Sequence, residues 1–461
     1  MSSNIGFVST RFAGTDGVSL EASKWARVLE NDGHTCFWFA GELERRPNRS
    51  YLVPAAHFQD KQNQWINTQI FGRRERNSGT TELIHLIRSK LKSQLYEFIY
   101  KFNIDRLIVE NALTIPLHIP LGLALAEIIA EKHIPTIAHH HDFYWERTRF
   151  MVNGISDYLG MAFPPRLPSI QHVVINSDAQ EQLAMRTGIA ATIIPNVMDF
   201  ENPIQVQPEK VRAFRNAIGL APDDKVILQP TRIIQRKGIE HAIELVKQLN
   251  DQRYKLVVTH EAGDEGYEYA EWLQQYASEQ NVDLRLAQIR LADPWRHQPS
   301  DTVDHTLWDI YPDADLITFP SSVEGFGNAL LEAIFFKKPV LINRYATFVR
   351  DIEPLGFDLI TMDGYLPKQA VQKTQAILGS EVLRQRMVTH NYEVAQQHFS
   401  YAVLHHHLHH LLAAVTQDAG QPLNLASTQL PNIVYLAKSH HFATPFEDNS
   451  SHSRPRQRAI F

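Results

Sequence analysis

The chain of 461 residues has few of the features that mark secreted, membrane-spanning or metal-cluster proteins. Its single cysteine, Cys36, excludes an intrachain disulfide and a cluster of cysteine metal ligands. No apolar run approaches the roughly 18 residues needed to cross a bilayer. The first residues lack the basic and then apolar pattern of a signal peptide. These absences predict a cytoplasmic protein without a transmembrane segment, and they leave contact with a membrane surface open.

Charge of one sign is also scarce. Lys and Arg number 45 and Asp and Glu 51, so the net charge is 45 − 51 = −6. Such a balance gives no general attraction to nucleic acid or acidic lipid, and we predict no nucleic-acid partner. The hydrophobic content of 44% and the charged content of 21% are typical of a globular protein, and the length suits two or three domains.

Short apolar runs alternate with amphipathic stretches through the first 200 residues, which is typical of a parallel sheet covered by helices. The patterns predict helices at 18–30, 82–102, 121–132 and 178–187, and strands at 5–9, 35–40, 106–109, 135–138, 172–176 and 192–195. Residues 45–80 lack a clean period, so we predict an excursion from the sheet there.

The alternation stops at about 200–222, where prolines and the lack of a period predict a linker, and then it restarts. The predicted strands are 225–229, 255–259, 284–287, 315–319 and 339–342, with helices at 239–249, 267–279, 329–336 and 381–415. We therefore predict domains at 1–200 and 201–400. Residues 401–461 would hold the end of the helical region and a tail, mostly extended or flexible, that is rich in Ser, Asn, Pro and His.

The most informative motif covers residues 320–332, Pro-Ser-Ser-Val-Glu-Gly-Phe-Gly-Asn-Ala-Leu-Leu-Glu. It joins a predicted buried strand to a predicted helix, whose N-terminus offers free N–H groups and suits a phosphate. Glu324 and Glu332 are eight residues apart and would lie on roughly one side of that helix. Carboxylates accept hydrogen bonds from hydroxyls, so the segment predicts a site for an anionic, polyhydroxylated ligand such as a nucleotide sugar.

This segment resembles the donor-site motif of retaining GT-B glycosyltransferases of family 4, also called glycosyl transferases group 1. The resemblance implies an α/β fold of two Rossmann-like domains facing each other across a cleft, with a C-terminal helix that crosses back to the first domain. The first domain would bind the acceptor and the second the donor. Glu324 would contact the transferred sugar and Glu332 the ribose, and the rest of the donor loop would comprise Gly325, Phe326, Gly327 and Asn328.

A basic run at residues 231–238 follows the predicted strand 225–229. Ligands of parallel α/β sheets bind at this edge, and fixed cations there would stabilise charge developing on a diphosphate leaving group. By the same resemblance, Arg232 and Lys237 would clamp the diphosphate. Arg236 is the competing candidate and is expected to face solvent. The alternative interpretation is a basic surface turn.

The loop after the first predicted strand contains Gly14 and Gly17. Glycine at such a turn lets the backbone approach a ligand, and the resemblance puts Gly17 against donor phosphate or acceptor. The alternative is a tight turn in which Thr15 or Asp16 caps the following helix, and both can hold together.

Three consecutive histidines follow the predicted strand 135–138. Neighbouring residues of an extended chain point opposite ways, so at most two of them converge, and we predict no metal site. The resemblance favours His141 as the residue that hydrogen-bonds a donor-sugar hydroxyl, with His139 and His140 as alternates. Tyr144 and Trp145 are expected to pack. The nearby cations Arg147 and Arg149 are candidates for an anionic acceptor.

Three further signals are interpreted as structural. Residues 195–199 resemble the family's interdomain hinge, without its usual glycine. Asp313 and Asp315 have the spacing of a metal motif found in another glycosyltransferase architecture, but they sit directly before the donor strand. Five histidines between 405 and 410 would lie outside an apolar face of leucines.

The resemblance implies a retaining glycosyltransferase that moves mannose or glucose from a GDP- or UDP-linked sugar to a hydroxyl acceptor, without metal or cofactor. The leaving phosphate itself would help to take the acceptor's proton. The loops at 14–21 and 140–147 suggest a small anionic acceptor such as a glucosyl-phosphoglycerate. A lipid or polysaccharide glycosyltransferase and a GT-B sugar-nucleotide epimerase are the alternatives.

Overall fold

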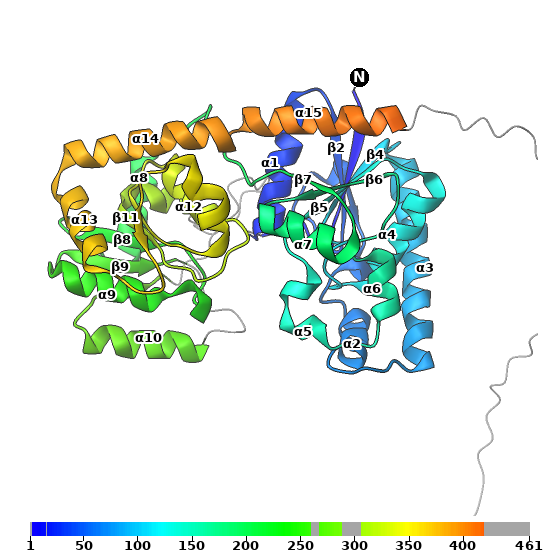
Figure 1. Ribbon diagram of the computed structural model, residues 1–461, viewed down its shortest axis with the longest axis horizontal. Coiled ribbons are helices and arrows are strands. Elements are labelled where there is room, and N and C mark those ends of the chain that lie inside the picture. Colours follow the sequence, from blue (N-terminus) through cyan, green and yellow to red (C-terminus); the bar gives the residue numbers. More distant parts are fainter. Residues whose placement is uncertain (1, 15, 260–266, 288–305, 419–461) are drawn as a thin grey trace, which may run out of the picture. The chain divides into compact units, whose positions relative to one another are not determined.

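The computed structural model describes residues 2–14, 16–259, 267–287 and 306–418, all of which belong to one compact unit. It contains two parallel sheets, each flanked by helices (Figure 1). This α/β architecture is the one predicted from the alternating pattern. The predicted tail beyond residue 418 lies outside the described residues.

The first sheet has seven strands in the order β3-β2-β1-β4-β5-β6-β7. Its strands are β1 (Asn4–Val8), β2 (Thr35–Ala40), β3 (Ser50–Leu52), β4 (Arg106–Glu110), β5 (Thr136–His140), β6 (Ile170–Val174) and β7 (Ala191–Ile193). Its helices are α1 (Gly17–Asn31), α2 (Lys61–Ile70), α3 (Ser78–Lys101), α4 (Ile119–Lys132), α5 (Thr148–Met151), α6 (Ser156–Ala162) and α7 (Ser177–Thr187).

The expected excursion at 45–80 is wrong in part. Residues 50–52 pair with β2 as an edge strand, which is too short to show an alternating pattern. Helix α3 also begins four residues before the predicted position of 82, because the Asn77 side chain accepts a hydrogen bond from the Thr80 N–H at 2.7 Å and caps the helix there.

The second sheet has six strands in the order β10-β9-β8-β11-β12-β13. Its strands are β8 (Lys225–Gln229), β9 (Tyr254–Val258), β10 (Leu284–Leu286), β11 (Ala314–Phe319), β12 (Val340–Asn343) and β13 (Ile360–Met362). Its helices are α8 (Pro208–Ala217), α9 (Ile239–Leu249), α10 (Tyr267–Glu279), α11 (Leu307–Ile310), α12 (Asn328–Phe335), α13 (Lys368–Gly379) and α14 (Glu381–Phe399).

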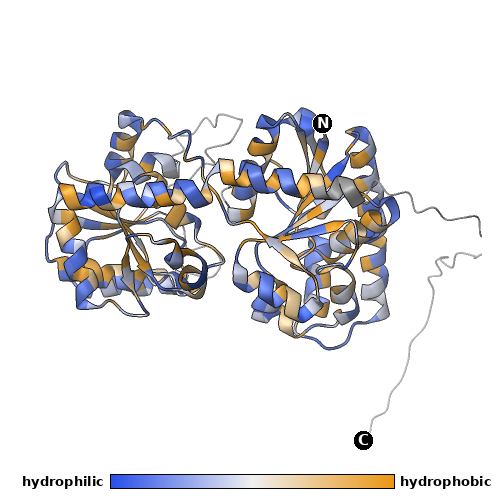
Figure 2. Cartoon of the chain, turned by 45° about the horizontal axis from the view of Figure 1, so that its top comes forward, coloured by the Kyte–Doolittle hydropathy of each residue, from blue (hydrophilic) through white to orange (hydrophobic). Residues whose placement is uncertain are grey.

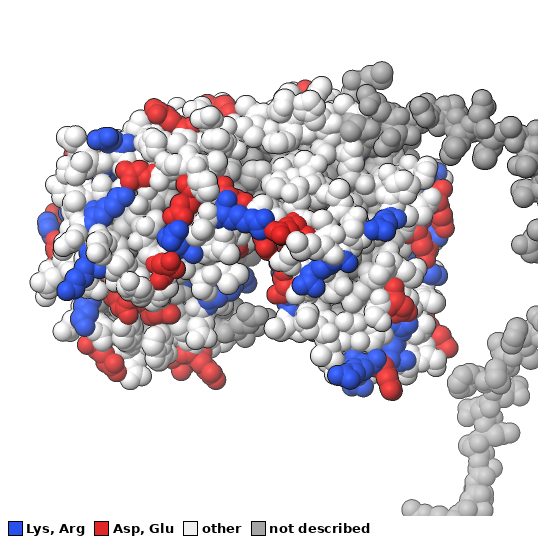
Figure 3. Space-filling model, viewed as in Figure 1, with Lys and Arg blue, Asp and Glu red and all other residues white. Residues whose placement is uncertain are grey.

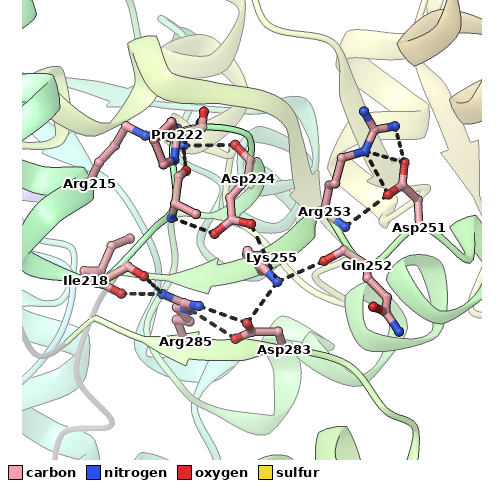
Figure 4. Close-up of polar contacts among 12 residues, drawn as sticks. Arg215, Ile218, Pro222, Asp224, Asp251, Gln252, Arg253, Lys255, Asp283 and Arg285 are labelled. Atoms are coloured by element: carbon pink, nitrogen blue, oxygen red, sulfur yellow. Dashed lines mark hydrogen bonds and ion pairs between the residues drawn. The ribbon is translucent and has the colours of Figure 1, made fainter.

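The predicted linker at 200–222 contains helix α8, so its interpretation as an unstructured connection is wrong. Polar contacts attach this helix to the second sheet (Figure 4). Arg215, in the last turn of α8, pairs with Asp313 at 2.8 Å and donates to the Ala221 carbonyl. Arg285 of β10 donates to the Ile218 carbonyl at 2.7 Å. These tertiary contacts stabilise a helix that the sequence pattern does not reveal.

Apolar side chains line both faces of each sheet, and the strands stand out as hydrophobic in Figure 2. On one face of the first sheet, Ile5 and Trp25 pack with the final helix, α15 (Tyr401–Asp418). Leu404, Leu408 and Leu411 of α15 are buried there. After α14 the chain leaves the second sheet, and α15 packs beside α1 of the first sheet, as predicted (Figure 1).

On the face shown in Figure 3, acidic and basic side chains of the described residues are intermixed. None of the helices in the described part of the chain combines the length and apolar character needed to cross a membrane.

Candidate active site

The donor loop between β11 and α12 has a backbone that only glycine suits at one position. Gly327 has φ +114°, and a Cβ there would lie 2.6 Å from the Tyr345 hydroxyl oxygen. That hydroxyl donates a 2.6 Å hydrogen bond to the Phe326 carbonyl. The buried Tyr345 side chain therefore stabilises the turn, which ends at the first residue of α12, Asn328. This is the strand–loop–helix arrangement that the motif predicts.

Glu332 lies in the second turn of α12 and accepts a 2.7 Å hydrogen bond from the hydroxyl of Tyr311. Burial raises the pKa of Glu332, while the hydrogen bond from Tyr311 and the charge of Lys24 oppose that rise. Burial likewise raises the pKa of Tyr311 far above its ordinary value, so its hydroxyl keeps its proton and donates. One carboxylate oxygen of Glu332 is thus oriented by the protein, and its role toward a ribose stays a prediction.

The basic run after β8 approaches the first glutamate of the donor loop. Lys237 is mostly buried and forms an ion pair with Glu324, and Arg236 lies 3.5 Å from the same carboxylate. Burial lowers the pKa of Lys237, and Glu324 counteracts part of this effect. Arg232 is exposed and contributes positive potential at Lys237. The predicted cations and carboxylate therefore share one small region, which a basic surface turn does not require.

Arg236 is partly exposed, as expected, but it is not free in solvent. It donates a 2.9 Å hydrogen bond to the Val323 carbonyl and so ties the basic run to the donor loop. The Ser322 N–H in turn donates to the Arg236 carbonyl at 2.9 Å.

The first loop of the chain meets the donor loop. Asp16 caps α1 by accepting from the Ser19 N–H at 3.1 Å, so the capping interpretation holds for this residue. A Cβ on Gly17 would lie 3.6 Å from the side-chain nitrogen of Asn328, so Gly17 lies beside the donor loop, and its contact with donor phosphate or acceptor stays a prediction. Thr15 lies outside the described residues.

Two asparagines that the sequence did not single out as site residues also reach the donor loop. Asn176, the N-cap of α7 two residues after β6, donates a 2.6 Å hydrogen bond to the Gly325 carbonyl. Asn196, in the predicted hinge, donates a 2.6 Å hydrogen bond to the Asn328 side chain. Their position at the carboxyl end of the first sheet is the one signal that could have identified them.

The three histidines separate as their alternation predicts. His139 and His141 share one face and lie beside the buried carboxylate of Glu110, whereas His140 points the other way and bonds His172 at 2.8 Å. The main-chain oxygen of His141 lies 3.5 Å from the place of a Cβ on Gly325. His141 therefore adjoins the donor loop through its main chain, and its contact with a donor sugar stays a prediction.

The aromatic and basic neighbours of these histidines have structural contacts. Trp145 is buried and stacks on Phe143 at 4.4 Å, which confirms packing. Arg147 forms an ion pair with Asp142, and Arg149 lies over the Phe150 ring at 4.5 Å.

The Asp313/Asp315 pair and the histidines of α15 occupy structural positions, as interpreted from the sequence. Asp313 pairs with Arg215, and Asp315 accepts from the Val226 N–H at 2.8 Å. On α15, His405 and His409 are exposed, opposite the buried leucines.

The fold has close counterparts among solved structures. A glycosyltransferase from Rickettsia africae ESF-5 superposes with a TM-score of 0.64 and 14% identity, over 90% of this chain and 99% of that one. The two parallel sheets and this likeness together define the fold class as GT-B.

Sequence comparison identifies the group within that class. The model of the family "Glycosyl transferases group 1" matches residues 210–394. A mannosylglucosylglycerate synthase of Petrotoga mobilis is 34% identical over 78% of this chain and 86% of its own length. A mannosylglucosylglycerate synthase of Thermotoga maritima is 33% identical over 84% of this chain and 94% of its own length. The chain belongs to the glycosyl transferases group 1 family and is an enzyme of that family.

Proposed function

We propose that the enzyme transfers a mannosyl group, with retention of configuration, from a nucleoside diphosphate mannose to glucosylglycerate. The observation that carries the proposal is the likeness to two mannosylglucosylglycerate synthases over most of their length and of this chain. Their names describe a product in which mannose is added to an anionic glucoside. This agrees with the small anionic acceptor suggested by the loops at 14–21 and 140–147. It makes glucosylglycerate, which carries no phosphate, the first acceptor to test.

The site geometry supports a division of roles for the donor. Arg232 and Lys237 would hold the diphosphate, where fixed positive charge stabilises the leaving group as the glycosidic bond breaks. Glu332, already oriented by Tyr311, would accept hydrogen bonds from the ribose hydroxyls. Glu324 would contact the mannosyl group, beside the N–H groups of Phe326 and Gly327.

The acceptor would react from the side of the first sheet, near Gly17 and His141. Its hydroxyl attacks the anomeric carbon on the face that the diphosphate leaves, and a phosphate oxygen takes the proton. Configuration is then retained without a covalent enzyme intermediate. This chemistry needs cations and hydrogen-bond donors at the leaving group, and we propose that neither a metal nor a cofactor is required.

A donor and acceptor matrix tests the proposal. GDP-mannose, GDP-glucose, UDP-glucose and UDP-galactose are each incubated with glucosylglycerate, with glucosyl-3-phosphoglycerate, or without acceptor, in EDTA. We expect turnover with a mannosyl donor and glucosylglycerate, and an α-linked product by NMR from the α-linked donor. Preference for the phosphorylated acceptor would change the assigned acceptor to glucosyl-3-phosphoglycerate. Nucleotide release without transfer, or interconversion of the donor sugar, would contradict the proposal.

A further inference from the structure

A buried carboxylate lies behind the predicted sugar-binding histidine. Glu110 ends β4, is fully buried, and is the register partner of His139 on β5. Its Oε2 atom lies 3.0 Å from Nδ1 of His139 and 2.9 Å from Nε2 of His141. Only the contact with His141 has hydrogen-bond geometry. Two residues apart on an extended strand end, the histidines present the same face to this carboxylate.

Burying a carboxylate is costly unless a partner compensates its charge. The second oxygen of Glu110, Oε1, has no hydrogen-bond partner within the described part of the chain, so the compensation comes from the histidines. Glu110 contacts His141, and the main chain of His141 adjoins the donor loop. A buried charge at this place points to a role in the chemistry.

We propose that Glu110 is a positioning residue for glycosyl transfer: by accepting the Nε2 hydrogen of His141, it leaves Nδ1 as the nitrogen that faces the donor sugar. The inference rests on the proposed function, because it requires His141 to contact that sugar. An ionised carboxylate can only accept, so Nε2 must carry the hydrogen. Nδ1 has no hydrogen-bond partner among the described residues, and the His141 side chain keeps 10% of its surface exposed.

The pair also sets whether Nδ1 donates or accepts. Burial would raise the pKa of Glu110, but the two histidines outweigh this and lower it to about 2. Burial alone would lower the pKa of His141, but Glu110 raises it above its ordinary 6.5. Protonated His141 then donates from Nδ1 to a sugar hydroxyl. His139 differs, since burial against Trp25 lowers its pKa and keeps its ring neutral.

Other charges face this cluster from neighbouring elements. Glu21 of α1 and Asp142 of the loop after β5 both raise the pKa of His141. Lys24 pairs with Glu21 at 2.9 Å and reduces that effect. Glu110 is the one that contacts the ring directly, so its removal should dominate the titration.

The principal experiment replaces Glu110 by glutamine, which keeps the shape and removes the charge. We expect kcat to fall by about 10- to 100-fold with a small change in donor KM. The alkaline limb of the pH–rate profile should move to lower pH by about one unit or more, because His141 loses its proton more easily. Histidine ring NMR, with the His141 signal assigned through His141→Asn, should show the same shift in its titration midpoint.

Two further variants separate this role from a structural one. Asn111 accepts from the main-chain N–H of His141 at 2.9 Å and donates to Asp142 at 3.1 Å, and Asp142 stays paired with Arg147 without it. Asn111 has φ +57°, so Asn111→Gly removes these two contacts without backbone strain. It should lower the rate without moving the pH profile. His139→Phe keeps a ring against Trp25 and removes the competing partner of Glu110, so the His141 midpoint should rise.

The NMR midpoint needs no substrate, so it tests the inference even if the transfer reaction is assigned wrongly. A neutral wild-type His141 ring whose ¹⁵N shifts place the hydrogen on Nδ1, or a midpoint that Glu110→Gln leaves in place, overturns the proposal; the first result stands even if that variant does not fold. The same three side chains also have ligand atoms within 4.8 Å of one another. Zinc bound at one equivalent, with loss in Glu110→Gln and activity that depends on it, would replace the positioning role with a metal site.

Discussion

At the scale of single residues, an ion pair and a hydrogen bond fix the two glutamates of the donor region. Lys237 and Glu324 form a mostly buried ion pair, and Tyr311 orients Glu332. Each member therefore contributes both to the local structure and to the proposed chemistry. Substitutions must be read through rate and binding measurements together with stability.

Replacing Lys237 by alanine should lower kcat by about 10²- to 10³-fold, because a fixed cation no longer stabilises the leaving diphosphate. The donor KM should change less. Steady-state kinetics on the folded variant measure both. Arg253→Ala is the matched control, since this exposed arginine lies just before β9 and pairs with Asp251, away from the donor loop (Figure 4). An unchanged kcat in Lys237→Ala would remove Lys237 from the mechanism.

Replacing Glu332 by alanine should weaken nucleotide binding by about 10- to 150-fold, since a hydrogen bond to a charged group contributes roughly 1.5–3 kcal/mol. Calorimetric titration with GDP and UDP measures the effect. Tyr311→Phe is the companion variant, because it removes the hydroxyl that orients Glu332 but keeps the carboxylate. We expect a smaller loss of affinity there. Equal affinities in wild type and Glu332→Ala would contradict the ribose assignment.

At the scale of elements, the loop between β11 and α12 is the part whose backbone is most narrowly determined. Gly327→Ala places a Cβ 2.6 Å from the Tyr345 hydroxyl in a left-handed conformation. We expect unfolding free energy to fall by about 1–3 kcal/mol for the backbone alone and donor affinity to fall with it. Urea unfolding and donor titration measure the two effects.

Gly356→Ala is the control for this element. Gly356 also has positive φ, +87°, but a Cβ there meets nothing within 4 Å. It should show the backbone cost without the clash and with unchanged donor binding. Equal losses of stability and affinity in the two variants would show that the Tyr345 contact does not shape the loop.

At the scale of the whole molecule, buried neutral histidines should make stability depend on pH. Burial lowers the pKa of His118 to about 4. Its Nδ1 accepts from the Leu121 N–H and caps α4, and its Nε2 lies 2.8 Å from the Ala55 carbonyl. The unfolded chain therefore binds a proton that the folded chain resists. Stability is present above pH 6.5 and is lost as pH falls toward 4.

For His118 alone, the loss between pH 7 and pH 5 is on the order of 2 kcal/mol. His172, whose pKa burial also lowers to about 4, adds to it. Urea unfolding at the two pH values measures the loss, and His118→Asn, which keeps a cap acceptor without titrating, should show less of it. A loss of the same size in that variant would assign the pH dependence elsewhere.

The sequence pattern predicted the strands that carry the site and missed elements that tertiary contacts stabilise. The buried run before Glu324 and the apolar face of α15 are as predicted, because burial requires apolar residues at regular intervals. Helix α8 and strands β3 and β13 were not predicted, since they are short or depend on partners distant in sequence. The boundaries at 200 and 400 stay predictions, as do the catalytic roles of the site residues.

What the sequence by itself determined is the chemistry available: two glutamates at fixed spacing, a basic run after a strand, and glycines where the backbone must turn. These are local properties, readable from residue type and interval. Only the tertiary structure decided which side chains meet. It placed the main chain of His141 beside the donor loop, brought Asn176 and Asn196 to that loop, and placed Glu110 against two histidines. Parallel strands bring residues distant in the chain to one sheet edge, and no local pattern encodes that neighbourhood.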